Sequence, residues 1–248
     1  MSEENEMSSF SILPEDCMSY IFSITSPKDA CIASAVSMGF KSAAESDFVW
    51  EQFLPSDYQD IIARSVSPVV YSSKKELYFR LCDSPLLLDG GKLSFRLSKS
   101  SGKRCFMLCA MEVSIIWADT PWYWNWKTLT ESRLNYAAYL MYKILENSYG
   151  LDSPSEASVK LVQQSMVQVE GENNNVYLKE PTLGQEGWIE FVPMPEERRD
   201  TWMEIELGEY FNDEGDEGDI QMQLLETELL HWKHGLIIEG IELRPKED

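Results

Sequence analysis

The first quarter of the chain has the apolar spacing of short amphipathic helices. After Leu13 and Pro14, apolar residues recur every three or four positions up to Ile24, which predicts a helix with one apolar face. Pro14 is expected at the first helical position, where its missing N–H costs nothing. The run Ser26-Pro27-Lys28-Asp29 offers an N-cap serine, a first-turn proline and an acid three residues after the cap. A second helix is therefore expected to follow at once.

The helical pattern continues to a proline at position 55, so residues 10–55 are expected to form one compact helical unit. Residues 1–9 precede this pattern and are expected to be a flexible N-terminus. Two more helices are predicted within 56–83, one at 58–63 and one at 72–82 that begins at a serine cap. These two helices would form a linker to a different architecture.

From about residue 90 the hydrophobic period changes to two. Leu93, Phe95 and Leu97 alternate with polar residues, and Ser100-Ser101-Gly102 then turns the chain back as a hairpin. Further strand-like runs lie at 105–111, 136–144, 159–170, 187–192, 201–207, 220–230 and 236–243. Many strands with little helical spacing between them indicate an antiparallel sandwich over residues 84–248. The expected fold class is α+β multidomain, with a helical module first and a β-sandwich second.

Composition and charge narrow the possible partners. The 248 residues are 44% hydrophobic and include eight tryptophans, which is enough to bury a sizeable core. Forty-two acids against twenty-one bases leave a net charge of −21, and such a field repels phosphate backbones and anionic lipids. Nucleic acid is therefore not expected as a partner. The acidic run 212–219 fits a solvated turn better than a Ca²⁺ loop, because its order lacks a terminal bidentate glutamate.

Cysteine usage and hydropathy bear on the compartment. The five cysteines, at 17, 31, 82, 105 and 109, are an odd number without close pairs, which encodes neither a disulfide framework nor a zinc site. Buried, reduced thiols are expected. No charged-then-apolar leader opens the chain, and its most apolar stretch, 105–117, is too short to span a bilayer. We expect no membrane insertion and a location in the cytoplasm, the nucleus or both.

Catalytic motifs are not evident in the sequence. The two histidines, His231 and His234, flank Trp232, and no nucleophile motif, phosphate-binding glycine loop or metalloprotease helix accompanies them. They could act as an acid and base pair, but surface or partly buried structural histidines explain them more simply. The sequence therefore predicts a protein without catalysis, cofactor or metal.

The helical region resembles a known module. The residues that carry the resemblance are Leu13-Pro14-Glu15-Asp16-Cys17, Ile21, Thr25 to Cys31, Ser34 to Ser37, Phe40, Ala43 and Phe48 to Pro55. This pattern resembles an F-box, in the plant form that is fused to a phloem-protein-2 domain. The resemblance implies an F-box at 10–55 that docks on a Skp-type adaptor of a cullin-RING ubiquitin ligase. The adaptor-binding residues would be Leu13, Pro14, Ile21 and Pro27, although each apolar residue could also be internal core.

The remaining chain resembles a phloem lectin (Nictaba-related) domain. The residues that carry this resemblance are 100–108, 114–119, 122–126, 136–140, 187–188, 202–211, 231–233 and 235–245. A jelly-roll-like lectin domain over 84–248 is implied, with a sugar site built on two tryptophans seven positions apart, here Trp117 and Trp124. Aromatic faces stack on pyranose rings, and Asp119 and Tyr123 would be rim groups for sugar hydroxyls. The alternative for each tryptophan is a place in the core.

One departure from the family pattern affects this expectation. In the family, further sheet follows the motif seen here as Glu131-Ser132-Arg133, but only Leu134-Asn135 precede Tyr136 in this chain. The missing segment is worth about two strands. Its loss would weaken or abolish sugar binding at the tryptophan pair, or leave the site to protein contacts.

Two functions from different classes remain open at this point. In the first, the protein is the substrate-receptor subunit of an SCF-type (Skp-cullin-F-box) E3 ubiquitin ligase, and its sandwich recruits protein or glycoprotein targets. In the second, it is a free-standing lectin for N-acetylglucosamine-containing glycans with a vestigial F-box. An enzyme of unrecognised type is a distant third.

Overall fold

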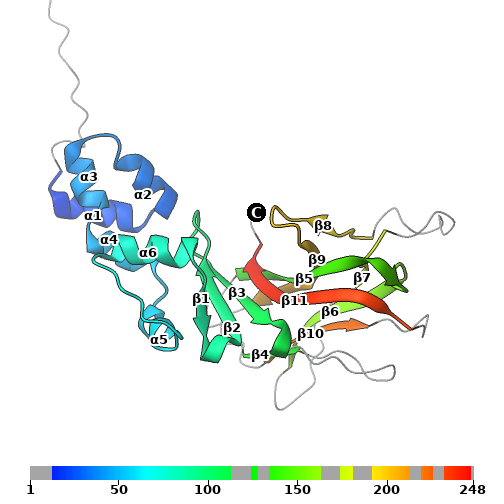
Figure 1. Ribbon diagram of the computed structural model, residues 1–248. Helices are drawn as coiled ribbons and strands as arrows, with labels where there is room; N and C mark the ends of the chain where they lie inside the picture. Colours follow the sequence, from blue (N-terminus) through cyan, green and yellow to red (C-terminus); the bar gives the residue numbers. More distant parts are fainter. Residues whose placement is uncertain are drawn as a thin grey trace, which may run out of the picture. The chain divides into compact units, whose positions relative to one another are not determined.

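The computed structural model divides the protein into two compact units, residues 1–104 and 105–248 (Figure 1). It describes residues 13–112, 124–127, 134–162, 174–180, 192–212, 219–225 and 232–246. Helices dominate the first unit and antiparallel strands the second. The predicted α+β fold class, with helices first and a sandwich second, is therefore confirmed.

Six short helices and two strands make up most of the described first unit. Their bounds are α1 Glu15–Ser23, α2 Pro27–Ala33, α3 Met38–Ala44, α4 Asp47–Phe53, α5 Tyr58–Ala63, α6 Lys74–Asp83, β1 Leu86–Leu88 and β2 Leu93–Leu97. The predicted caps hold at Ser26, which accepts from the Asp29 N–H at 3.1 Å, and at Ser73, which accepts from the Glu76 N–H at 3.2 Å. Pro14 takes the N-cap position of α1 instead of its first turn.

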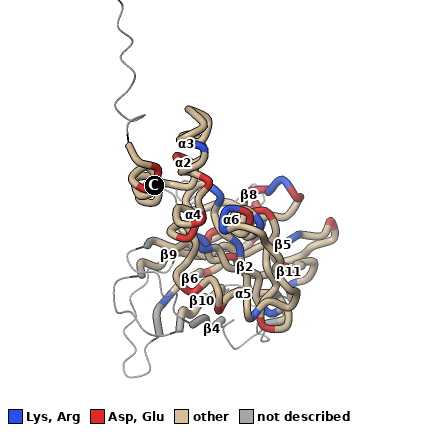
Figure 2. Tube along the Cα trace, turned by 90° about the vertical axis from the view of Figure 1, so that its left-hand side faces the viewer, with Lys and Arg blue, Asp and Glu red and all other residues tan. Residues whose placement is uncertain are grey.

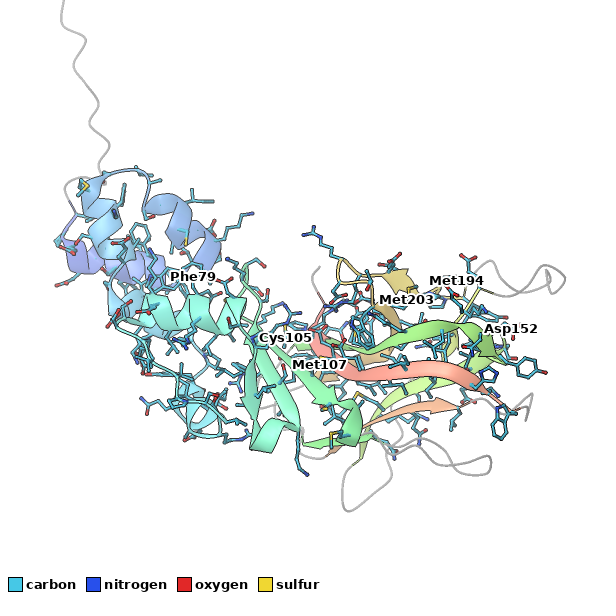
Figure 3. All side chains as sticks on the ribbon, viewed as in Figure 1. Phe79, Cys105, Met107, Asp152, Met194 and Met203 are labelled. Carbon is cyan, nitrogen blue, oxygen red and sulfur yellow. The ribbon has the colours of Figure 1, made fainter. Side chains whose placement is uncertain are left out.

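Trp50 of α4 forms the core of the helical unit. Its side chain is fully buried, and its Nε1–H donates to the Ala44 carbonyl at 2.7 Å. The rings of Tyr78 and Phe79, both on α6, lie 5.2 and 5.3 Å from the Trp50 ring, and Figure 3 labels Phe79. The helix that the sequence assigned to a linker thus packs directly on α4.

The predicted hairpin turn after β2 is confirmed, and an ion pair of the buried Arg104 lies next to it. The Gly102 N–H donates to Ser98 O at 2.8 Å, and a Cβ at Gly102, where φ is +70°, would lie 3.1 Å from Phe53 O. Arg104, only 4% exposed, donates through Nη1 to Asp57 Oδ2 at 3.0 Å, and its Nη2 lies 2.8 Å from Oδ1. This ion pair, with one charge-assisted hydrogen bond, ties the segment before α5 to Arg104.

Two antiparallel sheets form the second unit. One has the strand order β3-β11-β5-β9-β8 and the other β4-β10-β6-β7. The bounds are β3 Arg104–Cys109, β4 Trp124–Lys127, β5 Leu134–Tyr149, β6 Pro154–Val162, β7 Asn174–Tyr177, β8 Glu196–Glu197, β9 Met203–Asn212, β10 Asp219–Leu225 and β11 His234–Pro245. The strands β2, β3, β5, β9, β10 and β11 overlap their predicted runs, whereas β6 begins at Pro154, before the predicted run 159–170, of which only 159–162 are described. The strands β1, β4, β7 and β8 were not expected. The predicted run 187–192 lies outside the described residues except at its end.

The sandwich core lies between the two sheets. Leu140 of β5 pairs with Ile205 of β9 and Ile241 of β11, and all three side chains are buried. A Cβ on Gly208 of β9 would lie 3.3 Å from Cγ2 of Val159 on β6, so the sheets approach closely there. The face that carries Leu140 therefore packs inward, which leaves its alternate neighbours on the outer face.

A network of charges covers the outer face of β5, β9 and β11. Glu242 is 4% exposed, and it accepts from Arg198 and from Arg244, each at 3.2 Å. Arg244 also donates to Glu204 at 2.6 Å, and its guanidinium lies 3.7 Å from the centroid of the Tyr139 ring. Figure 2 shows basic and acidic residues mixed around β8. Burial raises the pKa of Glu204, but its hydrogen bonds and attraction to the arginines outweigh burial and lower it.

We expect Arg244→Met to destabilise the second unit by about 2 kcal/mol, because Glu204 and Glu242 lose a shared partner while they stay largely buried. Arg199→Met, at an exposed arginine of the turn after β8, is the matched control and should leave stability unchanged. Urea unfolding followed by tryptophan fluorescence measures both. Equal midpoints for the two variants would contradict a stabilising network.

The lowered pKa of Glu204 also predicts how stability changes with pH. A carboxyl whose folded pKa lies below its ordinary value of 4.5 stabilises the fold fully above that pH. That contribution is lost as the pH falls through the lower folded value. Urea midpoints measured from neutral pH down through this range should therefore fall less steeply for Arg244→Met than for the parent. A parallel fall in both proteins would rule out this linkage.

Candidate functional site

The structure exposes part of the predicted adaptor-binding set. Leu13 is 36% exposed, and Pro14 beside it is also exposed, just before α1. Ile21 is half-buried on α1, where it lines a pocket. Pro27 is buried at the first position of α2, so it belongs to the interior of the unit and is not exposed to a partner.

Further apolar side chains are exposed on α1, α2 and α3 and in the connections between these helices. We call them, together with Leu13, the helical apolar surface: Leu13, Tyr20, Ile24, Ile32, Val36 and Met38. Tyr20 and Ile24 are 60% and 70% exposed and stand one turn apart on α1, while Met38, at the start of α3, is 81% exposed. Large apolar side chains gathered in this way mark interaction sites in soluble proteins.

A pocket of ≈ 170 Å³ opens among α1, α2 and α3. Apolar side chains line it throughout: Met18, Ile21, Phe22, Ala33, Val36 and Phe40. The Phe22 and Phe40 rings lie 5.6 Å apart and form part of its wall. Because Val36 belongs to both the pocket and the exposed set, the pocket is continuous with the helical apolar surface. It can receive one apolar side chain of a partner.

Hydrogen bonds hold α1 on α3 and so keep this surface in place. The Ser19 hydroxyl donates to the Ala43 carbonyl at 3.2 Å, and the Ser42 hydroxyl donates to Glu15 Oε1 at 2.6 Å. Sequence reasoning found Leu13 and Ile21 but missed Val36 and Met38. Val36 lies in the short connection between α2 and α3 and Met38 is the first residue of α3, where helical spacing does not indicate which side chains point outward.

The predicted sugar-site residues lie largely outside the described part of the chain. Trp117, Asp119 and Tyr123 fall in the 113–123 gap. Trp124 begins β4, where its backbone pairs with Met222 of β10 at the edge of the second sheet. The geometry of the tryptophan pair therefore stays a prediction.

The structure also bears on the expectations for metal ligands, histidines and cysteines. No group of three potential metal ligands occurs among the described residues, and the acid run 213–218 lies outside them, as does His231. His234 is exposed and stacks on Tyr149. The five cysteines form no disulfide, but only Cys105 is buried and Cys17 is exposed, contrary to the expected burial of the thiols. Burial does raise the pKa of Cys82, to about 11, which keeps that thiol protonated.

Within the described ranges, none of the helices combines the length and apolar character that crossing a bilayer requires.

Comparison with protein families identifies both parts of the chain. The F-box domain family matches residues 10–52, which include α1 to α3 and most of α4. The Phloem protein 2 family matches residues 103–135 and 130–245. These two matched stretches overlap at residues 130–135, next to the point where the sequence pattern predicts a missing segment.

Curated relatives match along nearly the whole chain. F-box protein PP2-B10 of Arabidopsis thaliana is 43% identical, covering 98% of this chain and 96% of its own length. F-box protein At2g02240 of the same plant is 41% identical, with coverage of 96% and 81%. F-box protein SKIP3, also of Arabidopsis thaliana, is 38% identical, with coverage of 94% and 87%.

Among solved structures, the CBM22-1 xylan-binding domain of Paenibacillus barcinonensis Xyn10C aligns with a TM-score of 0.28 and 10% identity, over 62% of this chain and 82% of that one. An alignment at this TM-score carries no argument about fold or ligand. The family matches and the curated relatives, in contrast, show that the chain belongs to the family of F-box proteins that carry a phloem protein 2 domain.

Proposed function

We propose that this protein is the substrate-receptor subunit of an SCF-type (Skp-cullin-F-box) E3 ubiquitin ligase. The observation that carries the proposal is the helical apolar surface of its F-box, with the pocket among α1, α2 and α3 beside it. Exposed apolar side chains lower the free energy of association when a partner removes them from water. A Skp-type adaptor is the partner that an F-box implies.

Docking would proceed by burial of a small number of anchor side chains. Tyr20, Ile24 and Met38 are each more than half exposed in the free protein, so each has apolar area to lose. The pocket accepts one large apolar side chain from the adaptor without rearrangement, because its walls are already formed. Interfaces of this kind draw most of their affinity from such central apolar contacts.

The two units would divide the work of the receptor. The F-box joins the ligase, and the phloem protein 2 domain selects the protein or glycoprotein to be ubiquitinated. The protein itself makes and breaks no bonds, because ubiquitin transfer belongs to the assembled ligase. Its place of action would be the cytoplasm, the nucleus or both. The alternative function is a free-standing lectin for N-acetylglucosamine-containing glycans, which would not need the adaptor.

The pocket gives a test of adaptor docking. Val36→Glu places a charge at the pocket wall and should weaken adaptor binding by at least about 2 kcal/mol, roughly thirtyfold. Val70→Glu is the matched control, because Val70 is 70% exposed against 66% for Val36 and lies in the same unit but outside the F-box match. Titration of the purified adaptor by calorimetry, with thermal unfolding to confirm the folds, measures both. Equal affinities of the two variants would contradict docking at the pocket.

The glycan part of the proposal has a separate test. We expect the full-length protein to bind N-acetylglucosamine-containing glycans weakly on a glycan array, and a Trp117→Ala plus Trp124→Ala variant to lose that signal, because aromatic stacking supplies the affinity. The adaptor titration of the same variant is the control and should be unchanged. Absence of signal from the folded parent would leave a protein-only receptor, and an unchanged signal in the variant would place the sugar site elsewhere.

A further inference from the structure

The outer face of β5 and β11 carries exposed apolar side chains beyond its charge network. Leu145 of β5 and Ile237 of β11 are 46% and 43% exposed. Ile237 pairs with Lys143 in the strand register, and both point away from the inner face that carries Leu140 (Figure 1). The Lys143 ammonium lies 4.6 Å from the centroid of the Trp202 ring. An apolar area with an aromatic border therefore continues the charged face.

A bulge in β11 places a carboxylate beside this apolar area. The register of β11 against β5 shifts between Ile238 and Gly240, which leaves the half-buried Glu239 as the extra residue. Its electrostatic neighbours include Arg198 and Lys143, so its side chain belongs to the outer face. Bulges re-aim side chains in this way next to functional sites.

The Glu239 carboxylate has no cation of its own. In the described part of the chain, no hydrogen bond or ion pair reaches it. The two nearby cations are engaged elsewhere. Arg198 pairs with Glu204 at 3.1 Å and with Glu242 at 3.2 Å, while Lys143 lies over an aromatic ring. Glu239 is therefore left to pair with a cation from outside the protein.

In its charged form, Glu239 costs the free protein stability. Burial and the nearby Asp200 carboxylate raise the pKa of Glu239 above its ordinary value of 4.5. A neutral glutamine at this position should therefore keep the fold as stable or make it more stable. The fold gives no reason for a carboxylate here, whereas recognition of a partner does, since functional groups are often held at a cost in stability.

We propose that Leu145, Ile237 and Glu239, which we call the Glu239 patch, bind a peptide segment of the target that presents a lysine or arginine beside a large apolar residue. The apolar side chain would cover Leu145 and Ile237, and the cation would pair with the Glu239 carboxylate. This inference rests on the proposed receptor function and names the chemistry of the target. It does not depend on adaptor docking.

The charge around the Glu239 patch decides between possible occupants. Four carboxylates and three cations surround it: Asp200, Glu204, Glu239, Glu242, Lys143, Arg198 and Arg244. The excess negative charge repels an acidic or phosphorylated segment. A neutral glycan would leave the Glu239 carboxylate without a cation. A basic peptide segment satisfies both the charge and the apolar area.

The test probes the full-length protein with an array of ten-residue peptides. Their four central positions vary over lysine, arginine, glutamate, leucine, phenylalanine and serine, between flanks of glycine and serine. Peptides with a lysine or arginine beside leucine or phenylalanine should bind. The same peptides with glutamate in place of the cation should bind at least about tenfold more weakly when titrated by fluorescence anisotropy.

Substitutions then place the peptide on the sheet. Glu239→Gln and Ile237→Ser should each weaken binding by at least about tenfold. Glu156→Gln is the control for the first, because Glu156 is also half-buried but lies on β6 in the other sheet. Phe211→Ser is the control for the second, because Phe211 is 57% exposed and pairs with Asn135 at the far end of β5. Both controls should bind as the parent does.

Three results would overturn the Glu239 patch. The folded parent could bind none of the peptides, Glu239→Gln could bind the cationic peptides as the parent does, or the glutamate peptides could bind equally well. Urea unfolding should show Glu239→Gln to be at least as stable as the parent, which separates recognition from a structural role. Adaptor affinity, titrated on the same samples, should equal that of the parent. Its absence in the parent would contradict the receptor function instead, so the two failures are distinguishable.

Discussion

The burial of Trp50 is the contact on which the helical unit depends. Helices of seven to nine residues are marginal alone, so α1 to α4 need a shared interior to stay folded. Trp50 supplies it: the ring packs against Tyr78 and Phe79 of α6, while Nε1 holds the turn between α3 and α4. With the interior filled from α4 and α6, the outer side chains of α1 to α3 are left free for a partner.

In the second unit, one face of a sheet is left outside the core. Its inner face is apolar and packs on the second sheet, while the outer face carries arginine and glutamate side chains that neutralise one another. Such a network adds little net stability compared with an apolar face, but each member becomes costly to remove alone. It also keeps this face polar.

Much of the fold could be predicted from local signals. A cap is predicted at Ser26 and at either Ser72 or Ser73 because a hydroxyl before a helical run satisfies an orphan amide, and the structure selects Ser73. The turn at Gly102 is predicted in the same way from its residue type. Helical spacing predicted the apolar face of the first helix, whereas the role of Leu13 and Ile21 as adaptor contacts came from the resemblance to an F-box. The strands β4 and β7 were missed because four residues give too short a period to detect, and the pocket was missed because residues 33 to 36 meet α1 only after folding.

By itself, the sequence determined that helices precede strands, the two family patterns and the excess of acid, since each depends on residue type and short spacing alone. Only the tertiary structure decided that Pro27 is buried, that α6 belongs to the helical core, and that Tyr149 meets His234. These facts join residues far apart in the chain or depend on which side of an element faces its neighbours. Hydrophobic spacing specifies that an apolar face exists, but the packing of other elements determines whether it is covered.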